Sequence, residues 1–303
     1  MTITRRRLIS ICAAWALVPA AARAAPGSTH LWMGLALGAR TSLRLAHPDA
    51  EAIAARVMAE LERLESILSL YRPHSALSRL NRDGQIEGPP FELLECLSLS
   101  GSVHRASGGR FDPTVQPLWA LWAEAATQGA QPDVSAIATA LRRTGWNKID
   151  IRSGSITLQP GMALTLNGIG QGYVADRVAA LLEAEGLTDI LIDTGEMRAL
   201  GGRPDGGDWP VRLESGERVP LRERALATSA PLGTTFDQGG RDGHILDPRT
   251  GRPSSPAWRS VSITAPSAAL ADALTTAACL MPDRESIDEM LRQFPGTRLD
   301  SLS

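Results

Sequence analysis

The sequence NGIGQGYVADRVAALLEAEG, residues 167–186, joins a glycine-rich turn to an amphipathic helix. Apolar residues of this stretch recur at helical steps of three and four: Val174, Val178, Leu181 and Leu182. Such spacing places them on one helix face, and Gly186 is typical of a helix end. A Gly-x-Gly-x-Gly turn before a helix can bring unpaired backbone amides close to a phosphate. The same turn also serves as a tight connection that binds nothing.

The glycine spacing differs from the GxGxxG of a dinucleotide-binding Rossmann turn. The nearest acid after it is Asp193, in a single Asp-Thr-Gly triplet. Aspartic proteases need two such loops, because their chemistry uses two adjacent carboxylates. The sequence therefore excludes that class and leaves the turn as a candidate phosphate site.

On either side of this stretch, helices dominate the first half of the chain and strands mix with helices in the second half. Helices are expected at residues 48–70, at 90–107, from an N-cap at Asp133 to Gly145, and, as the last helix, at 268–281 after Ser267. Strands are expected at 31–45, in two short segments within 149–166, at 190–192 and at 197–200. No regular strand–helix alternation is present, so we expect an α+β fold with one domain over residues 25–303.

Residues 1–24 have the pattern of a secretory signal peptide. Arg5–Arg7 precede an apolar run of 15 residues, 8–22, and Ala22-Arg23-Ala24 follows as a small-residue cleavage site. The run is shorter than the roughly 20 residues of a membrane-spanning helix. The paired arginines also fit a twin-arginine export signal. We therefore expect a cleaved signal, a periplasmic protein and no permanent membrane span.

Composition narrows the remaining classes. The chain of 303 residues is 43% hydrophobic and 21% charged, as folded proteins are. With 31 Lys+Arg against 33 Asp+Glu the net charge is −2, which gives no electrostatic basis for nucleic-acid binding. Cys12, Cys96 and Cys279 are too few and too dispersed for a disulfide framework or a cysteine metal site. Cys96 and Cys279 lie in apolar helical patterns, so we expect buried thiols.

Asp272 and Thr276 are four residues apart on the expected last helix, so they share one face. A carboxylate and a hydroxyl, together with a backbone carbonyl, are the oxygen ligands that Mg²⁺ prefers. The alternative is local, because an Asp near a helix start favours the dipole and a helical Thr can bond to the preceding turn.

His244 and Asp247 lie three residues apart where a strand runs into an Asp-Pro turn. The two side chains could orient each other for acid–base chemistry. For an isolated His-x-x-Asp, a purely structural turn is the alternative.

These patterns become specific when they are taken in order with other motifs. The matching stretches are Met33-Gly34, LSLYRPHSALSRLN (68–81), FDPTVQPLWALW (111–122), NGIGQGYVADR (167–177), ALATSA (225–230), HILDPRTGRP (244–253) and TAPSAALADALTTA (264–277). Together they resemble the ApbE family, the FAD:protein FMN transferases, over almost the whole chain after the signal peptide.

The resemblance implies an ApbE-like, T-fold-related mixed sheet with flanking helices and an FAD site in a cleft between the helical and sheet parts. It implies a Mg²⁺-dependent enzyme, with Mn²⁺ equally suited to oxygen ligands. Such an enzyme cleaves FAD, releases AMP and attaches FMN through a phosphoester to a Thr or Ser of an acceptor protein. The implied acceptors are periplasmic electron-transfer proteins that carry a short Ser/Thr motif.

The resemblance also assigns roles to single residues. Asp272, Thr276 and the backbone carbonyl of Gly168 match the metal ligands, while His244 and Asp247 match a catalytic segment. The positions that match the FAD site are Met33, Tyr71, Arg110, Phe111, Asp112, Thr165, Gln171, Ile245 and Leu246.

Three positions depart from the family pattern. Thr165 stands where many members have Asp, Gln171 where they have Lys, and Glu196 where Asp is usual. Thr165 and Gln171 together remove one negative and one positive side chain, so the local charge can stay balanced. The sequence does not determine how this pair of changes affects the affinity for FAD. Two alternative functions therefore remain: an FAD pyrophosphatase that passes FMN to water, and a flavin-binding protein without turnover. The retained Asp272 and Thr276 argue against the second.

Overall fold

The computed structural model describes residues 30–303 except 38, 46–48, 204–205, 214 and 255–256. The expected signal peptide lies outside the described residues. Within them, no helix combines the length and the apolar character needed to cross a membrane.

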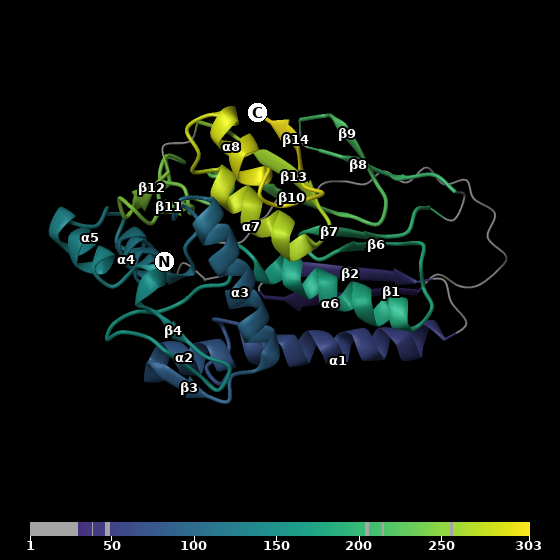
Figure 1. Ribbon diagram of the computed structural model, residues 1–303, viewed down its shortest axis with the longest axis horizontal. Helices are drawn as coiled ribbons and strands as arrows, with labels where there is room; N and C mark the ends of the chain where they lie inside the picture. Colours follow the sequence, from purple (N-terminus) through teal and green to yellow (C-terminus); the bar gives the residue numbers. More distant parts are fainter. Residues whose placement is uncertain (1–29, 38, 46–48, 204–205, 214, 255–256) are drawn as a thin grey trace.

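A seven-stranded antiparallel sheet organises the molecule (Figure 1), in the order β1-β2-β6-β7-β10-β13-β14. Its strands are β1 (His30–Ala36), β2 (Ala39–Leu45), β6 (Ile190–Asp193), β7 (Met197–Leu200), β10 (Ala225–Ser229), β13 (Val261–Ala265) and β14 (Arg298–Leu302). The small sheets are formed by β3 (Gln85–Glu87), β5 (Ser155–Thr157) and β4 (Asp150–Ile151), by β8 (Trp209–Arg212) and β9 (Arg218–Leu221), and by β11 (Leu246–Asp247) and β12 (Arg252–Pro253).

Helices α6 and α7 lie across one face of the large sheet, with α1 beside α6 and α3 over them (Figure 1). The helices are α1 (Ala50–Leu68), α2 (Ala76–Asp83), α3 (Phe91–Ala106), α4 (Gln116–Thr127), α5 (Val134–Leu141), α6 (Gly170–Ala184), α7 (Ala268–Ala278) and α8 (Arg284–Leu291). Two short 3₁₀ turns cover Pro113–Val115 and Trp146–Lys148.

A cluster of buried alanines, here called the alanine layer, lies where α6 and α7 pack on the sheet, with the partly buried Leu270 against it. Its buried members are Ala175, Ala225, Ala227, Ala265, Ala268 and Ala271. Because a methyl group is the smallest side chain that can fill such a layer, the two helices approach the strands closely. On the opposite side of the sheet, the β8–β9 hairpin packs Val211 and Leu221 against Met197 and Leu226.

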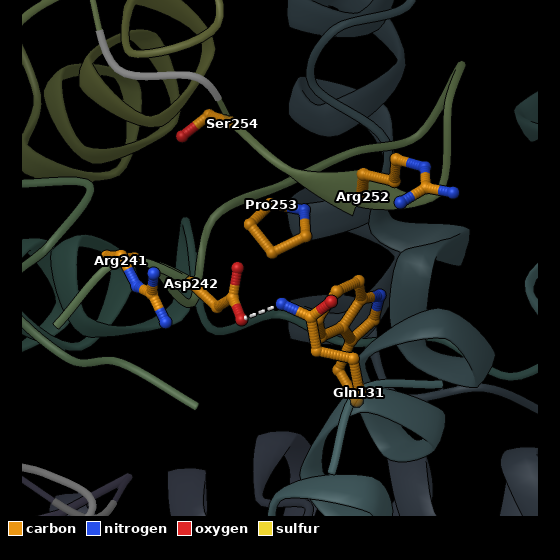
Figure 2. A pocket seen from close by; sticks show the side chains of 7 residues that line it. Gln131, Arg241, Asp242, Arg252, Pro253 and Ser254 are labelled. Atoms are coloured by element: carbon orange, nitrogen blue, oxygen red, sulfur yellow. Dashed lines mark hydrogen bonds between the residues drawn. The ribbon is translucent and has the colours of Figure 1, made fainter. Parts of the chain in front are cut away.

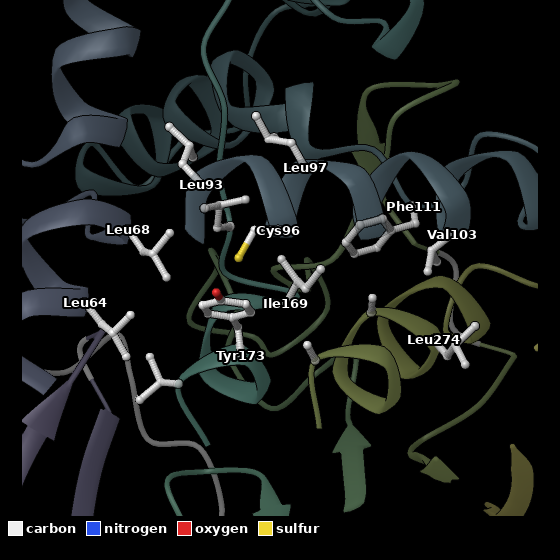
Figure 3. Close-up of a cluster of buried hydrophobic side chains, with 14 of the residues drawn as sticks. Leu64, Leu68, Leu93, Cys96, Leu97, Val103, Phe111, Ile169, Tyr173 and Leu274 are labelled. Atoms are coloured by element: carbon white, nitrogen blue, oxygen red, sulfur yellow. The ribbon is translucent and has the colours of Figure 1, made fainter. Parts of the chain in front are cut away.

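The main hydrophobic core lies between α1, α3, α6 and α7 (Figure 3). Leu64 of α1, Leu93 and Cys96 of α3, and Tyr173 of α6 point into it. The Tyr173 hydroxyl keeps a partner, since it donates to Glu95 Oε2 at 2.5 Å. Cys96 and Cys279 are both buried and unbridged, which confirms the expectation of buried thiols.

The α+β class is confirmed, and the expected helices at 48–70, at 90–107 and after the glycine-rich turn within 167–186 correspond to α1, α3 and α6. The single strand expected at 31–45 is wrong: the segment is a hairpin of β1 and β2, in which Ala36 pairs with Ala39. Helices α2 and α4 were not expected from the sequence.

Two expected helices end earlier than predicted, for the same reason. After α5, Arg143 and Thr144 donate their amides to carbonyls three residues back, and Leu280 and Met281 do so after α7. This tighter pattern closes a helix. Nor is α7 the last element, because α8 and β14 follow it.

Candidate functional site

The chain segment before the glycine-rich turn is fixed by hydrogen bonds from two distant elements. Asn81 of α2 pairs with the backbone of Leu164 through both ends of its amide, at 2.8 and 2.7 Å. The Thr165 amide donates to the Pro113 carbonyl at 2.8 Å. The turn therefore starts from a fixed position, although the Thr165 side chain has only a local partner, the Asn167 amide at 3.2 Å.

Gly168 lies against Thr276 and Phe111. All three residues belong to the site that the sequence predicts. A methyl group on Gly168 would be 3.0 Å from Thr276 Oγ1 and 3.3 Å from Phe111 Cε2. The backbone of the turn can come this close to the Thr276 hydroxyl because residue 168 has no side chain. Phe111 is buried in the main core, where its ring packs against the turn.

Asp272 joins the same place through the start of α6. The Gly172 amide donates to Asp272 Oδ2 at 3.3 Å, and the carboxylate is 95% buried. A methyl group on Gly172 would lie 2.2 Å from the Ala268 carbonyl oxygen, so only glycine lets α6 and α7 meet at this spacing.

Burial governs the protonation of Asp272 and its neighbour Glu196. Burial raises the pKa of Asp272 to about 7, and the bond from the Gly172 amide opposes the rise. Burial and the charge of Asp272 raise the pKa of Glu196 well above its usual range, while the Thr228 amide opposes this. In the sequence, Glu196 is distinguished only as a departure from the family pattern. Its position at the start of β7, next to a strand that α7 covers, was not visible in the sequence.

Arg110 links the end of α7 to the β11–β12 hairpin. Its Nε donates to the Leu280 carbonyl at 3.1 Å, and Nη1 donates to the Ser107 carbonyl at 3.1 Å. Burial and the nearby charge of Arg249 lower the pKa of Arg110, while Asp247 opposes this. The structure thus brings Arg110 close to the predicted catalytic segment.

Asp112 has a local structural role. Its Oδ1 accepts from the amide and the hydroxyl of Thr114 at 2.9 and 2.7 Å, and Oδ2 accepts from the Trp146 amide at 3.3 Å. Asp112 is 92% buried. These contacts shape the turn that carries Phe111 and leave little carboxylate surface for a ligand.

His244 is a half-buried imidazole whose Nδ1 lies 3.1 Å from the Thr234 carbonyl oxygen. Burial lowers the pKa of His244, against hydrogen bonds with the Thr234 and Pro231 carbonyls. A neutral imidazole has one N–H group to donate to a carbonyl and keeps its other ring nitrogen as an acceptor.

Asp247 does not orient His244, because Arg249 occupies its carboxylate. Arg249 Nε and Nη2 donate to Asp247 at 2.9 and 2.6 Å, and the Arg249 amide adds a third bond at 2.9 Å. Burial acts to raise the pKa of Asp247, but the bonds and charge of Arg249 outweigh it and the pKa is lowered. These contacts favour the turn-forming alternative for Asp247.

The remaining expected FAD residues have different environments. Tyr71 follows α1 and is 57% exposed, whereas Ile245 and Leu246 are buried in two separate hydrophobic clusters. Gln171 is partly exposed in the first turn of α6. Met33 lies in β1 opposite Ser42.

Two surface pockets have linings that do not include these residues. One, of about 220 Å³, is lined by Trp122, Pro253 and polar side chains, and in it Gln131 donates to Asp242 at 2.6 Å (Figure 2). Its arginines, Arg241 and Arg252, flank the pocket without pointing toward each other (Figure 2). The other, of about 530 Å³, lies around α8 and the loop after it. Neither pocket is lined by a residue that the sequence assigned to the site.

Within the described part of the chain, no three His, Cys, Asp or Glu side chains gather as a metal site. The expected ligand set differs in kind, because only Asp272 is a carboxylate and the other two donors are a hydroxyl and a carbonyl. Oxygen donors of this mixture suit a hard divalent cation.

Comparison with known proteins places these features in one family. The ApbE family profile matches residues 37–298. The chain is 33% identical to the FAD:protein FMN transferase of Treponema pallidum, over 82% of this chain and 77% of that protein. It is 30% identical to the FAD:protein FMN transferase of Klebsiella pneumoniae, over 75% and 70%. The apo form of Pseudomonas stutzeri flavinyl transferase ApbE superposes with a TM-score of 0.77 at 26% identity, over 88% and 89% of the two chains.

Proposed function

The chain belongs to the ApbE family, and from this premise we propose that it is an FAD:protein FMN transferase. It cleaves FAD, releases AMP and attaches FMN through a phosphoester to a Ser or Thr of an acceptor protein. Curated relatives with that name match most of the chain. The structural observation that carries the proposal is the meeting of Gly168, Thr276 and Asp272 where the glycine-rich turn and α6 contact α7.

Asp272, Thr276 and the Gly168 carbonyl are the proposed ligands of Mg²⁺ or Mn²⁺. Asp272 supports this assignment, because burial with one long hydrogen bond leaves its carboxylate poorly compensated. Among the described residues no Lys or Arg forms an ion pair with it. When bound, the cation would supply positive charge that neutralises the FAD diphosphate and the departing AMP.

His244 is the proposed acceptor of the proton from the attacking hydroxyl. Its lowered pKa keeps the imidazole neutral at physiological pH, and the Thr234 carbonyl holds the ring through Nδ1. The unprotonated nitrogen of the neutral ring would then act as the base. Arg249 would keep Asp247 in the turn that presents this segment.

Tyr71 and Gln171 are the proposed contacts of the nucleotide at the surface of the protein. Tyr71 offers an exposed aromatic ring on which a flat heterocycle can stack. Gln171 offers neutral hydrogen-bonding groups where many family members have a Lys, so we expect binding to depend less on charge at this position.

The experiment that tests the proposal is an intact-mass measurement after the protein, FAD, Mg²⁺ and an acceptor domain with the family's Ser/Thr motif are incubated together. Asp272→Asn is the matched control, because it keeps the shape of the side chain and removes its charge. Transfer predicts an added FMN mass on the acceptor that the control lacks.

The other outcomes identify the alternatives. Metal-dependent release of AMP without a mass gain on the acceptor indicates a pyrophosphatase. FAD that stays bound and uncleaved indicates a flavin-binding protein and contradicts the proposal.

We also propose export to the periplasm. The support is the pattern of residues 1–24, with its arginines, short apolar run and small-residue cleavage site. Mass measurement of the protein from a periplasmic fraction should show a chain that begins near residue 25, and a full-length cytoplasmic chain would contradict it.

A further inference from the structure

Asp176, on the second turn of α6, caps the start of a different helix. Its Oδ1 accepts from the Ala268 amide at 2.8 Å and its Oδ2 from the Ala269 amide at 2.9 Å. The first amides of a helix have no partner within the helix, so Asp176 satisfies two that α7 leaves open. Ser267, the N-cap residue of α7, binds only the Leu270 amide, at 3.3 Å.

The contact is reciprocal. While Asp176 of α6 receives the first amides of α7, Asp272 of α7 receives the Gly172 amide in the first turn of α6. Each helix thus contributes a carboxylate to the positive end of the other. Between the two bonds, the bare Cα of Gly172 lies against the Ala268–Ala269 peptide, so the helices have no space in which to slide.

A third element supports Asp176 from the sheet. Arg198 of β7 forms an ion pair with Asp176, with Nε 3.4 Å from Oδ1, and the two side chains are only 18% and 21% exposed. Its neighbours Met197 and Ala199 face the opposite side of the sheet, toward the β8–β9 hairpin. Strand alternation therefore directs Arg198 toward the helices.

We propose that Asp176 is a positioning residue that fixes α6 and its glycine-rich turn against α7, and so sets the spacing between the Gly168 carbonyl and the side chains of Asp272 and Thr276. The inference rests on the proposed function for the metal-binding role of those three groups. Gly168 lies two residues before α6, and Asp272 and Thr276 lie one turn apart on α7. A shift between the helices would therefore separate ligands that belong to different elements.

The test compares Asp176→Asn with Ser267→Ala in the purified protein. An Asn side chain keeps the shape but can accept only one of the two amides. Ser267→Ala also removes a cap from α7, yet it breaks no link to α6. Arg198→Gln is a milder variant, because it removes the ion pair and keeps both amide bonds.

Two readouts distinguish positioning from simple loss of stability. The first is hydrogen exchange of the peptide that covers residues 166–172, in protein without metal. Asp176→Asn should speed its exchange, Arg198→Gln should do so less, and Ser267→Ala should leave it unchanged. The second is Mn²⁺ binding, followed by the electron paramagnetic resonance signal of free Mn²⁺. Loss of a residue that orients metal ligands costs about tenfold or more in affinity, so we expect that loss for Asp176→Asn and none for Ser267→Ala.

Unchanged exchange at 166–172 in Asp176→Asn would overturn the inference, as would equal effects of Ser267→Ala. A parent protein that binds no Mn²⁺ would overturn the metal site of the proposed function, and with it the ligand-spacing role. In that case, exchange at 166–172 would still show whether Asp176 holds the two helices together.

Discussion

Asp272 and Glu196 are both more than nine-tenths buried and lie close enough to influence each other. Burial raises the pKa of Asp272 to about 7. Burial and the charge of Asp272 raise the pKa of Glu196 well above its usual range. Two carboxylates this close do not ionise independently, so a negative charge on one favours the neutral form of the other.

Metal binding should accordingly weaken at low pH. Because a proton on Asp272 competes with the cation and its pKa is about 7, the apparent dissociation constant for Mn²⁺ should be about tenfold weaker at pH 6 than at pH 8. Titrations at both pH values measure this. Equal affinities at the two pH values would contradict the raised pKa.

The stability of the metal-free protein should show the opposite dependence on pH. The folded-state pKa of Asp272 lies above its ordinary value of 3.8, so the folded protein holds a proton that the unfolded chain releases. This contribution is present below pH 4 and is lost as the pH rises to about 7, on the order of 4 kcal/mol. Denaturant unfolding of the parent and of Asp272→Asn should converge at low pH, separate between about pH 4 and 7, and differ by a constant amount above pH 7. Parallel curves would show that Asp272 ionises freely in the folded state.

Glu196→Gln should be tolerated, because the raised pKa of Glu196 favours its neutral form and the amide is neutral as well. The pH dependence of Mn²⁺ binding should stay as in the parent. In the infrared spectrum at pH 7, the substitution should remove a protonated-carboxyl band. A spectrum that is the same in the parent and the variant would contradict the raised pKa of Glu196.

At the level of elements, the site depends on how closely α6 and α7 approach each other. Gly172 faces the Ala268 carbonyl, and the alanine layer lies beneath both helices. Neither contact involves a charged group, but both set the distance between α6 and α7. The positions of the charged side chains on the two helices therefore depend on the small residues between them.

Gly172→Ala should destabilise the protein strongly. The added methyl group would lie 2.2 Å from the Ala268 oxygen, and overpacking of this kind costs about 1–3 kcal/mol. Gly154→Ala is the matched control, because nothing lies within 4 Å of the added group there. Chemical denaturation of both variants checks the difference. Equal midpoints would show that α6 and α7 separate at little cost.

At the level of the whole molecule, the sequence predicted the long elements better than the short ones. Helices α1, α3 and α6 carry apolar residues at helical spacing over 15 residues or more. The eight residues of α2 are mostly polar, and α4 begins with a proline in its first turn, so neither has a clear periodic signal. The turn of the β1–β2 hairpin includes Leu37 at φ 48°. Leu rarely adopts a positive φ, so the sequence did not indicate a turn there.

The candidate site divides in the same way. Asp272 and Thr276 were recognisable because their spacing is local, and Gly168 because it matches a family motif. Asp176 and Arg198 were not recognised, since the bond from Asp176 to Ala268 joins residues 92 positions apart. Contacts between residues so far apart in the chain arise from tertiary packing, which cannot be read from a single sequence.

The two buried thiols report on the integrity of the whole fold. Burial raises the pKa of both Cys96 and Cys279, with nearby carboxylates adding to the effect at Cys96, so neither forms the reactive thiolate. We expect a thiol reagent to label them only at the rate of unfolding, and in parallel. Rapid labelling of one thiol in the native protein would reveal local opening around it.

The alanine layer also has a genetic consequence. A single-base change in an alanine codon yields Val, Thr, Ser, Pro, Asp, Glu or Gly, and every one of these except glycine is larger. The six codons of the layer thus have almost no missense neighbour that fits the space between α6, α7 and the sheet. In a randomly mutated gene selected for function, silent changes should dominate at these six codons, although an alanine side chain carries no chemistry.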